Sequence, residues 1–171
     1  MPHNDPQPTI ESASRADLDT LAELWVRLAT DQRRHDSAVR PEANREAMRE
    51  TLGAYLVNDG LLVARLDGAI IGFASVSIER GTLELDTTRG LLSNIYVEPA
   101  YRNRGIGTAL LEAAEDSLVQ RGADTMLLEV MADNESAQQF YRRKGYDEFR
   151  VTMGRSLEDR DENDTHSKED G

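Results

Sequence analysis

Apolar side chains recur at helical spacing near the N-terminus. Leu18, Leu21, Trp25 and Leu28 share one face of a 3.6-residue repeat, which predicts a helix that ends near Gln32. A single Trp in such a row is typical of a core side chain rather than of a ligand-binding surface. We therefore expect this helix to cover a hydrophobic core with one face.

Apolar runs, helix-start signals and turn residues define the other elements. A hairpin is expected where Asp67-Gly68 separates two apolar runs, because Asp-Gly suits a type I′ turn. Within one domain over 9–155, the other predicted elements are a strand over 9–12, a helix from Pro41 to about Val57, hairpin strands over 61–66 and 69–78, a central strand over 91–97, a helix ending near Gln120, a strand over 125–130, a helix over 136–144 and a last strand near 149–153. Residues 1–8 are predicted to be a flexible tail, and 156–171 a disordered acidic tail.

A turn rich in glycine and arginine separates the central strand from the helix that follows it. The first backbone N–H groups of a helix have no partner within the helix, and the helix dipole places partial positive charge there, so an anion can bind them. Gly105 and Gly107 remove side chains that would block such an anion, while Arg102 and Arg104 add positive charge. This pattern predicts a site for a phosphate or a pyrophosphate.

Phosphate-binding loops differ in the residues around their glycines. A P-loop needs a Lys followed by Ser or Thr after its last glycine, whereas Gly107 is followed by Thr108. A dinucleotide-binding loop needs a third glycine, which this turn lacks. The spacing Arg102-x-x-Gly105-x-Gly107, after the strand and the residues Val97-Glu98-Pro99, resembles the acetyl-CoA loop of the GCN5-related N-acetyltransferase (GNAT) family.

A second segment resembles the same family. The strand-like run over 127–130 is followed by Asn134, by a predicted helix that carries Tyr141, and by Gly145-Tyr146. The two motifs stand in the order and at the separation found in the family, and together they cover about residues 91–146.

The resemblance implies an α/β domain of GNAT type, with a mixed, mostly antiparallel central sheet flanked by helices. It also implies acetyl-CoA as the co-substrate, with backbone groups of the central strand facing the pantetheine and the thioester. The implied cofactor-binding residues are Ile95, Tyr96, Val97, Arg102, Asn103, Arg104, Gly105, Gly107, Thr108 and Asn134. Asn134 could also be only the N-cap of the next helix.

Two residues are candidates for the catalytic groups. By resemblance, the Tyr141 hydroxyl would protonate the leaving thiolate; the alternative is a packing Tyr beside Phe140. The spacing of Glu129, Asn134 and Tyr141 is similar to that of ribosomal-protein alanine N-acetyltransferases, in which the Glu is the base. The same Leu-Glu-Val pattern occurs in GNAT relatives without that role. Glu84, Glu98 and His35 are the alternative candidates, and His35 is expected in a solvated linker.

Composition and charge limit which partners, metals and locations are expected. The 171 residues suffice for one domain, the net charge is −12, and there is no Cys. An acidic chain without long apolar runs argues against nucleic acid and membrane partners, and it favours a cytoplasmic location. Neither a signal-peptide pattern nor metal-ligand spacing is present, so we expect no metal. Only two of the 20 basic residues are Lys, which suggests a halophilic source. Exposed sheet edges would allow two copies of the chain to form a homodimer.

These observations predict an enzyme that transfers the acetyl group of acetyl-CoA directly to a primary amine within a ternary complex. The acceptor could be a small amine or a protein N-terminus, since no acceptor-binding signature is recognisable. The alternative is a non-catalytic CoA-binding or protein-interaction module of the same fold. Such a module would be expected to have a broken phosphate loop or to lack the Tyr.

Overall fold

The computed structural model describes residues 6–158 and 160. The chain divides into two compact units, residues 1–138 and 139–171, and each is described by itself. Residues 1–5 of the predicted N-terminal tail, and 159 and 161–171 of the predicted acidic tail, lie outside the described residues.

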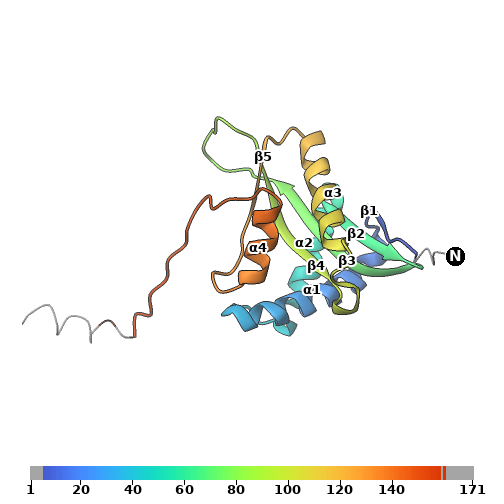
Figure 1. The fold of residues 1–171 in the computed structure, drawn as a ribbon, viewed down its shortest axis with the longest axis horizontal. Helices are drawn as coiled ribbons and strands as arrows, with labels where there is room; N and C mark the ends of the chain where they lie inside the picture. The colour runs from blue at the N-terminus through green and yellow to red at the C-terminus, as the bar shows by residue number, and fades with distance from the viewer. Residues whose placement is uncertain (1–5, 159, 161–171) are drawn as a thin grey trace, which may run out of the picture. The chain divides into compact units, whose positions relative to one another are not determined.

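A five-stranded sheet forms the centre of the first unit, with the strand order β1-β2-β3-β4-β5 (Figure 1). The strands β1 to β4 pair with one another in antiparallel fashion, and β5 runs parallel to β4. The strands are β1 (Thr9–Ser12), β2 (Leu61–Leu66), β3 (Ala69–Ile78), β4 (Arg89–Val97) and β5 (Thr125–Leu128). The mixed, mostly antiparallel sheet confirms the predicted fold class.

Helices cover both faces of this sheet (Figure 1). The main helices are α1 (Leu18–Gln32), α2 (Arg45–Val57), α3 (Ile106–Gln120) and α4 (Glu135–Arg143), and short 3₁₀ turns η1 to η4 span Arg15–Asp17, Arg33–His35, Glu42–Asn44 and Pro99–Tyr101. A Cβ atom on Gly90 would lie 2.5 Å from Leu118 of α3, so glycine allows α3 to approach one face of β4 closely. Phe73 and Tyr96 instead share a buried cluster with α1 and α2 on the other face.

The turn η1, which leads into α1, is fixed by a capping arrangement of Ser14 and Asp17. The Oδ2 atom of Asp17 accepts hydrogen bonds from the Ser14 backbone N–H at 2.8 Å and from Arg65 Nη2 at 3.0 Å. Burial alone would raise the pKa of Asp17, but the hydrogen bonds from Ser14 and Arg65 hold it below its usual value. The carboxylate therefore joins the N-terminus of α1 to β2.

Two predicted strands differ from the structure. The strand β5 ends at Leu128 rather than near Val130. Within the described chain, residues 149–153 form no strand, although Phe149, Val151 and Met153 alternate as in a half-buried strand and are 59%, 69% and 90% exposed. Alternation favours an extended backbone, but it does not supply the neighbouring strand that a sheet requires. Among the described residues, no helix has the length and apolar character that crossing a membrane demands.

Candidate active site

A β-bulge in β4 brings two polar side chains to the same face of the sheet. Ser75 pairs with Asn94 and Val76 with Leu92, so Ser93 is the extra residue. Tyr55 of α2 donates a hydrogen bond from its hydroxyl to Ser93 Oγ at 2.8 Å. Asn94 Nδ2 donates to the fully buried Ser75 Oγ, also at 2.8 Å. The bulge thus replaces apolar packing with a polar cluster in the middle of the central strand.

Next to this bulge, β4 and β5 separate. Their pairing stops at Leu92 and Leu128, while β4 continues to Val97. The Glu98 N–H donates to Ile71 O of β3 at 2.8 Å, and the alternation of an antiparallel ladder then directs the backbone groups of Tyr96 to β3. The same alternation directs the backbone groups of Ile95 and Val97 to the side from which β5 has diverged. We call this space between the two strands the opening.

The side chain of Tyr96 belongs to the core, on the α1 side. It is 5% exposed, and burial together with the charges of Glu98 and Asp31 raises its pKa. Of the three strand residues predicted to face the co-substrate, Ile95 and Val97 therefore direct backbone groups to the opening. Tyr96 contributes packing instead.

The predicted phosphate-binding turn ends in a helix N-terminus without a side-chain cap. Asn103 and Gly105 have positive φ angles of 63° and 80°, and Gly105 occupies the N-cap position of α3. The first helical hydrogen bond runs from Ala109 N to Gly105 O, which leaves the N–H groups of residues 106–108 without intrahelical partners. The first turn of α3 carries no acidic residue. This arrangement is suited to bind an anion.

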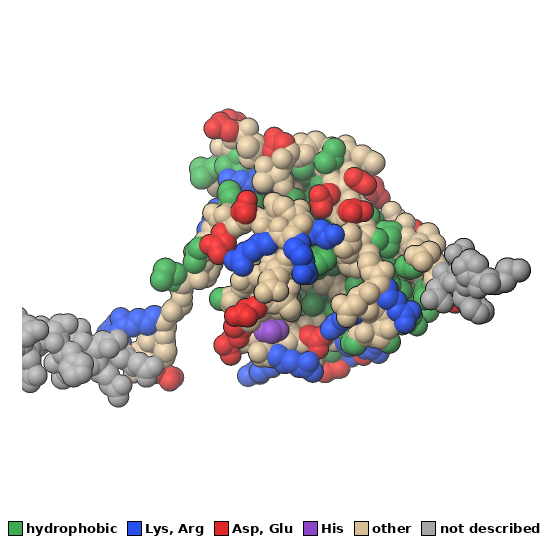
Figure 2. Space-filling model, viewed as in Figure 1, with side chains coloured by type: hydrophobic (Ala, Val, Ile, Leu, Met, Phe, Trp, Pro, Cys, Tyr) green, Lys and Arg blue, Asp and Glu red, His purple; other side chains and the backbone are tan. Residues whose placement is uncertain are grey.

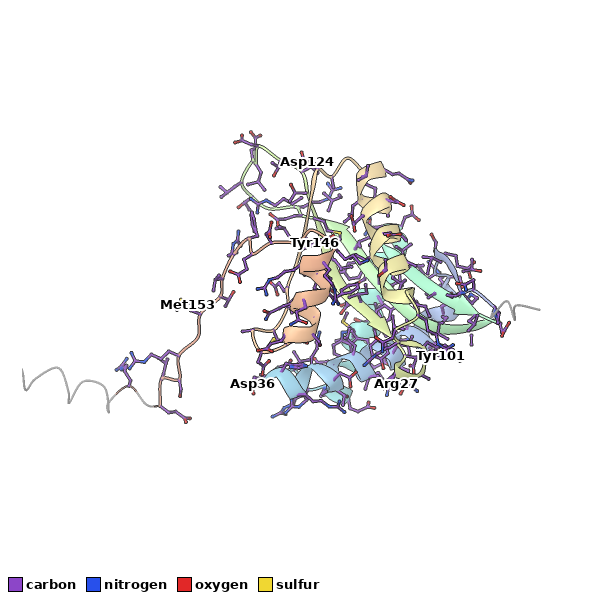
Figure 3. The ribbon with its side chains drawn as sticks, viewed as in Figure 1. Arg27, Asp36, Tyr101, Asp124, Tyr146 and Met153 are labelled. Atoms are coloured by element: carbon purple, nitrogen blue, oxygen red, sulfur yellow. The ribbon has the colours of Figure 1, made fainter. Side chains whose placement is uncertain are left out.

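The two arginines of the turn have different surroundings. Arg102 donates from Nε to Val97 O at 2.9 Å, and its Nη2 lies 3.1 Å from Asp31 Oδ2 of α1. In the described chain, Arg104 has no ion pair, and its guanidinium lies 5.6 Å from the centre of the Tyr101 ring. Tyr101 marks this turn beyond the end of β4 in Figure 3. Arg102 therefore fixes the turn, while Arg104 is left to contribute charge to a ligand.

The predicted base lies just beyond the end of β5. Glu129 is exposed and makes no hydrogen bond or ion pair with another described residue. Five residues later, Asn134 Oδ1 accepts hydrogen bonds from Ala137 N at 3.3 Å and from Ser136 Oγ at 3.2 Å. The N-cap role expected for Asn134 is thus present, and the carboxylate of Glu129 is accessible to solvent.

Tyr141 lies in the second unit, in the last turns of α4. Its ring is in edge-to-face contact with Phe140 and Tyr146, at centroid distances of 5.2 and 5.8 Å. Burial raises the pKa of Tyr141 to about 12. The phenol is therefore protonated at neutral pH, as a proton donor must be.

The chain matches a known protein family. A model described as the acetyltransferase (GNAT) family matches residues 20–146 of the chain. The chain belongs to the GNAT family.

Curated GNAT relatives match part of the chain. N-alpha-acetyltransferase 30 of Schizosaccharomyces pombe is 38% identical over 82 residues, covering 48% of this chain and 51% of that protein. The ribosomal protein bS18-alanine N-acetyltransferase of Escherichia coli K12 is 46% identical over 60 residues, covering 35% and 40%. The chain thus spans about half of the length of the first of these relatives and 40% of the length of the second.

Solved GNAT structures share the fold over most of the chain. Aminoglycoside N-acetyltransferase AAC(6')-Iy in complex with CoA gives a TM-score of 0.70 at 22% identity, covering 92% of this chain and 99% of that one. A structure from Clostridium acetobutylicum, described as a predicted acetyltransferase with acetyl-CoA, gives a TM-score of 0.72 at 18% identity, covering 88% of this chain and 96% of that one. At sequence identities this low, the similarity shows a shared fold and nothing more.

Several residues of this GNAT site escape prediction from the sequence. The polar pair Ser93-Asn94 interrupts an apolar strand, and that interruption is a signal from which the bulge could have been predicted. No local signal points to Tyr55 or Asp31, whose partners are 38 and 71 residues away in the sequence. Among the described residues, no group of three or more His, Asp or Glu side chains could hold a metal ion.

Proposed function

We propose that this GNAT protein is an N-acetyltransferase that moves the acetyl group of acetyl-CoA to a primary amine. The observation that carries the proposal is the opening between β4 and β5, next to a helix N-terminus that lacks a side-chain cap and is flanked by arginines. A thioester-bearing chain would lie along β4, and its pyrophosphate would bind the first N–H groups of α3. The acetyltransferase domain comprises residues 9–155 in this proposal.

The chain's own groups supply the remaining requirements of acetyl transfer. Backbone groups of Ile95 are directed to the opening, where they can hydrogen-bond the thioester-bearing chain. The neutral amine attacks the thioester carbonyl, and Glu129 accepts the proton that the amine nitrogen loses as the new C–N bond forms. When the C–S bond breaks, the thiolate takes a proton from the Tyr141 hydroxyl. The amine attacks directly, so no acetyl-enzyme intermediate is formed.

Relatives favour two classes of acceptor. The names of the S. pombe and E. coli relatives describe acetylation of protein N-termini, and that of AAC(6')-Iy describes acetylation of aminoglycosides. The spacing of Glu129, Asn134 and Tyr141 supports a protein N-terminus as the first candidate. The net charge of −12 favours cationic acceptors of either class.

The test is release of free thiol from acetyl-CoA with a panel of amines, in dilute buffer and at molar KCl. The panel contains polyamines, aminoglycosides, amino acids and peptides with a free Ala or Ser N-terminus. We expect turnover with the peptides, and blocking the peptide α-amine should abolish it. Turnover with a single small amine would move the acceptor to that class. Tight acetyl-CoA binding without turnover of any amine would favour the non-catalytic module.

A further inference from the structure

The C-terminal end of α1 and the 3₁₀ turn η2 that follows it make contacts on both sides of the opening. On the β4 side, Asp31 Oδ2 lies 3.1 Å from Arg102 Nη2 in the phosphate-binding turn. On the β5 side, His35 Nδ1 lies 3.3 Å from Asp133 Oδ1 in the loop between β5 and α4. Because β4 and β5 have separated after Leu92 and Leu128, residues 31–35 span from one diverging strand to the other.

These two contacts differ in strength. Arg102 also donates to Val97 O and lies 5.5 Å from the centre of the Tyr96 ring, so several interactions secure the β4 side. On the β5 side there is a single contact between side chains that are 32% and 55% exposed. Figure 2 shows the histidine, in purple, at the surface with acidic side chains next to it. The β5 side is therefore the one that can open without disturbing the phosphate-binding turn.

The contact between His35 and Asp133 connects the linker of residues 33–41 to the rest of the domain. Asp36 follows with a φ angle of 66°, an uncommon left-handed conformation for a non-glycine residue (labelled in Figure 3). Within the described residues, the other hydrogen bonds of residues 33–41 are local. For example, Arg33 Nη1 donates to Val39 O at 2.8 Å, and Ser37 N donates to Gln32 O at 3.3 Å. In the described chain, His35 thus makes the polar contact that joins this linker to a distant element.

We propose that His35 and Asp133 form a clasp that holds the linker of residues 33–41 across the opening, and that the acceptor amine enters when the clasp releases. The proposal rests on the proposed function for its acceptor. His35 acts through the linker as a positioning residue and takes no part in proton transfer. An exposed contact of this kind changes an equilibrium constant by only about two- to five-fold, which allows release during each turnover.

Limited trypsin digestion of the folded protein tests the clasp without any acceptor. Cleavage after Arg33 and Arg34 reports the fraction of chains in which the linker is released. Asp133→Asn leaves the sequence at these cleavage sites unchanged, so we expect it to speed cleavage about two- to five-fold. Asp19→Asn, which removes an exposed ion pair between α1 and α2, is the matched control and should leave the rate unchanged. Unchanged cleavage in Asp133→Asn would overturn the clasp.

Kinetics with a peptide that bears a free Ala N-terminus test the effect of the clasp on the KM for the acceptor. His35→Ala should change the KM for the peptide about two- to five-fold, with an unchanged Kd for acetyl-CoA. His35→Gln, which keeps a hydrogen-bond donor, should restore part of the change, and Asp133→Asn should add nothing to His35→Ala. An equal change in acetyl-CoA affinity would contradict the assignment to the acceptor side. Failure of the wild type to turn over any amine would instead reject the proposed function, and the digestion result would still decide whether the clasp exists.

Discussion

The two strands that diverge at the opening each lead into a helix, and the two helix N-termini are built differently. The N-terminus of α3 has Gly105 at the N-cap, no side-chain cap and no acidic residue in its first turn. The N-terminus of α4 has Asn134, whose Oδ1 accepts from Ala137 N, and Glu135 in its first turn. The chain thus satisfies the N–H groups of Glu135 and Ala137 at the start of α4 internally and leaves those at the start of α3 open.

This difference is the reason that we assign anion binding to α3 rather than to α4. Both helices have a dipole with a positive N-terminus, but at α4 a carboxylate and an amide oxygen already occupy that field. At α3, the neighbouring side chain of Arg104 adds to this field, while Arg102 is paired with Asp31 and fixes the turn. A helix N-terminus is therefore suited to bind an anion where the sequence has no side chain that caps its N–H groups.

Introducing a carboxylate at the open N-terminus should have the largest effect. Gly107→Glu places a negative charge in the first turn of α3, where it repels the pyrophosphate and lowers acetyl-CoA affinity at least about 100-fold. A Glu at this position interacts favourably with the helix dipole, so the melting temperature should be kept. Calorimetric titration with acetyl-CoA measures the Kd. Val119→Glu, at the exposed far end of the same helix, is the control that should bind normally.

Removing the proton donor should separate catalysis from binding. Tyr141→Phe is expected to lower kcat about 100-fold, the usual contribution of a general acid, and to leave the Kd for acetyl-CoA within about two-fold. The measurement is thiol release with the best amine of the panel, beside a binding titration. If kcat stayed the same and the Kd rose, Tyr141 would be a binding residue and the roles of the two helices would have to be redrawn.

The same phenol predicts a loss of stability in alkali. The pKa of Tyr141 is about 12 in the folded chain, against about 10 for an unperturbed Tyr. The folded state holds the phenol proton more tightly than the unfolded state does. The resulting contribution to the free energy of unfolding is therefore complete below pH 10 and is lost as the pH rises to 12. At pH 11 the wild type should have lost about 1 kcal/mol of unfolding free energy relative to Tyr141→Phe. Urea unfolding of both proteins at pH 8 and pH 11 measures this difference, and an equal loss in both would contradict it.

The comparison also shows what could be predicted from the sequence. The open N-terminus of α3 depends on residues adjacent in the chain: a glycine that accepts a positive φ, a missing cap and two arginines. The cap at Asn134 is equally local. Hydrophobic periodicity placed α1, α2, α3, the hairpin and the central strand near their observed bounds, because each element buries one face of its own pattern.

The rest of the site depends on partners that are distant in the sequence. The side chain of Arg102 forms an ion pair with Asp31 of α1, and Ser93 accepts a hydrogen bond from Tyr55 of α2. These pairings follow from how helices pack on the sheet, which no local pattern encodes. The strand expected over 149–153 was wrong for the same reason, since alternation is local whereas strand pairing is not.

The smallest effects should come from the capped N-terminus, where two roles of one side chain can be separated. Asn134→Ala removes the cap of α4 and should cost about 1 kcal/mol of unfolding free energy, while Asn134→Gly should cost only a few tenths, since glycine is tolerated at an N-cap. Urea unfolding gives both values, and titration with acetyl-CoA gives the Kd of each variant. If Asn134 only caps the helix, affinity should follow the loss of stability and be weaker in the Ala variant. If its amide also contacts the co-substrate, both variants should lose affinity equally, and α4 would share in the binding that we assign to α3.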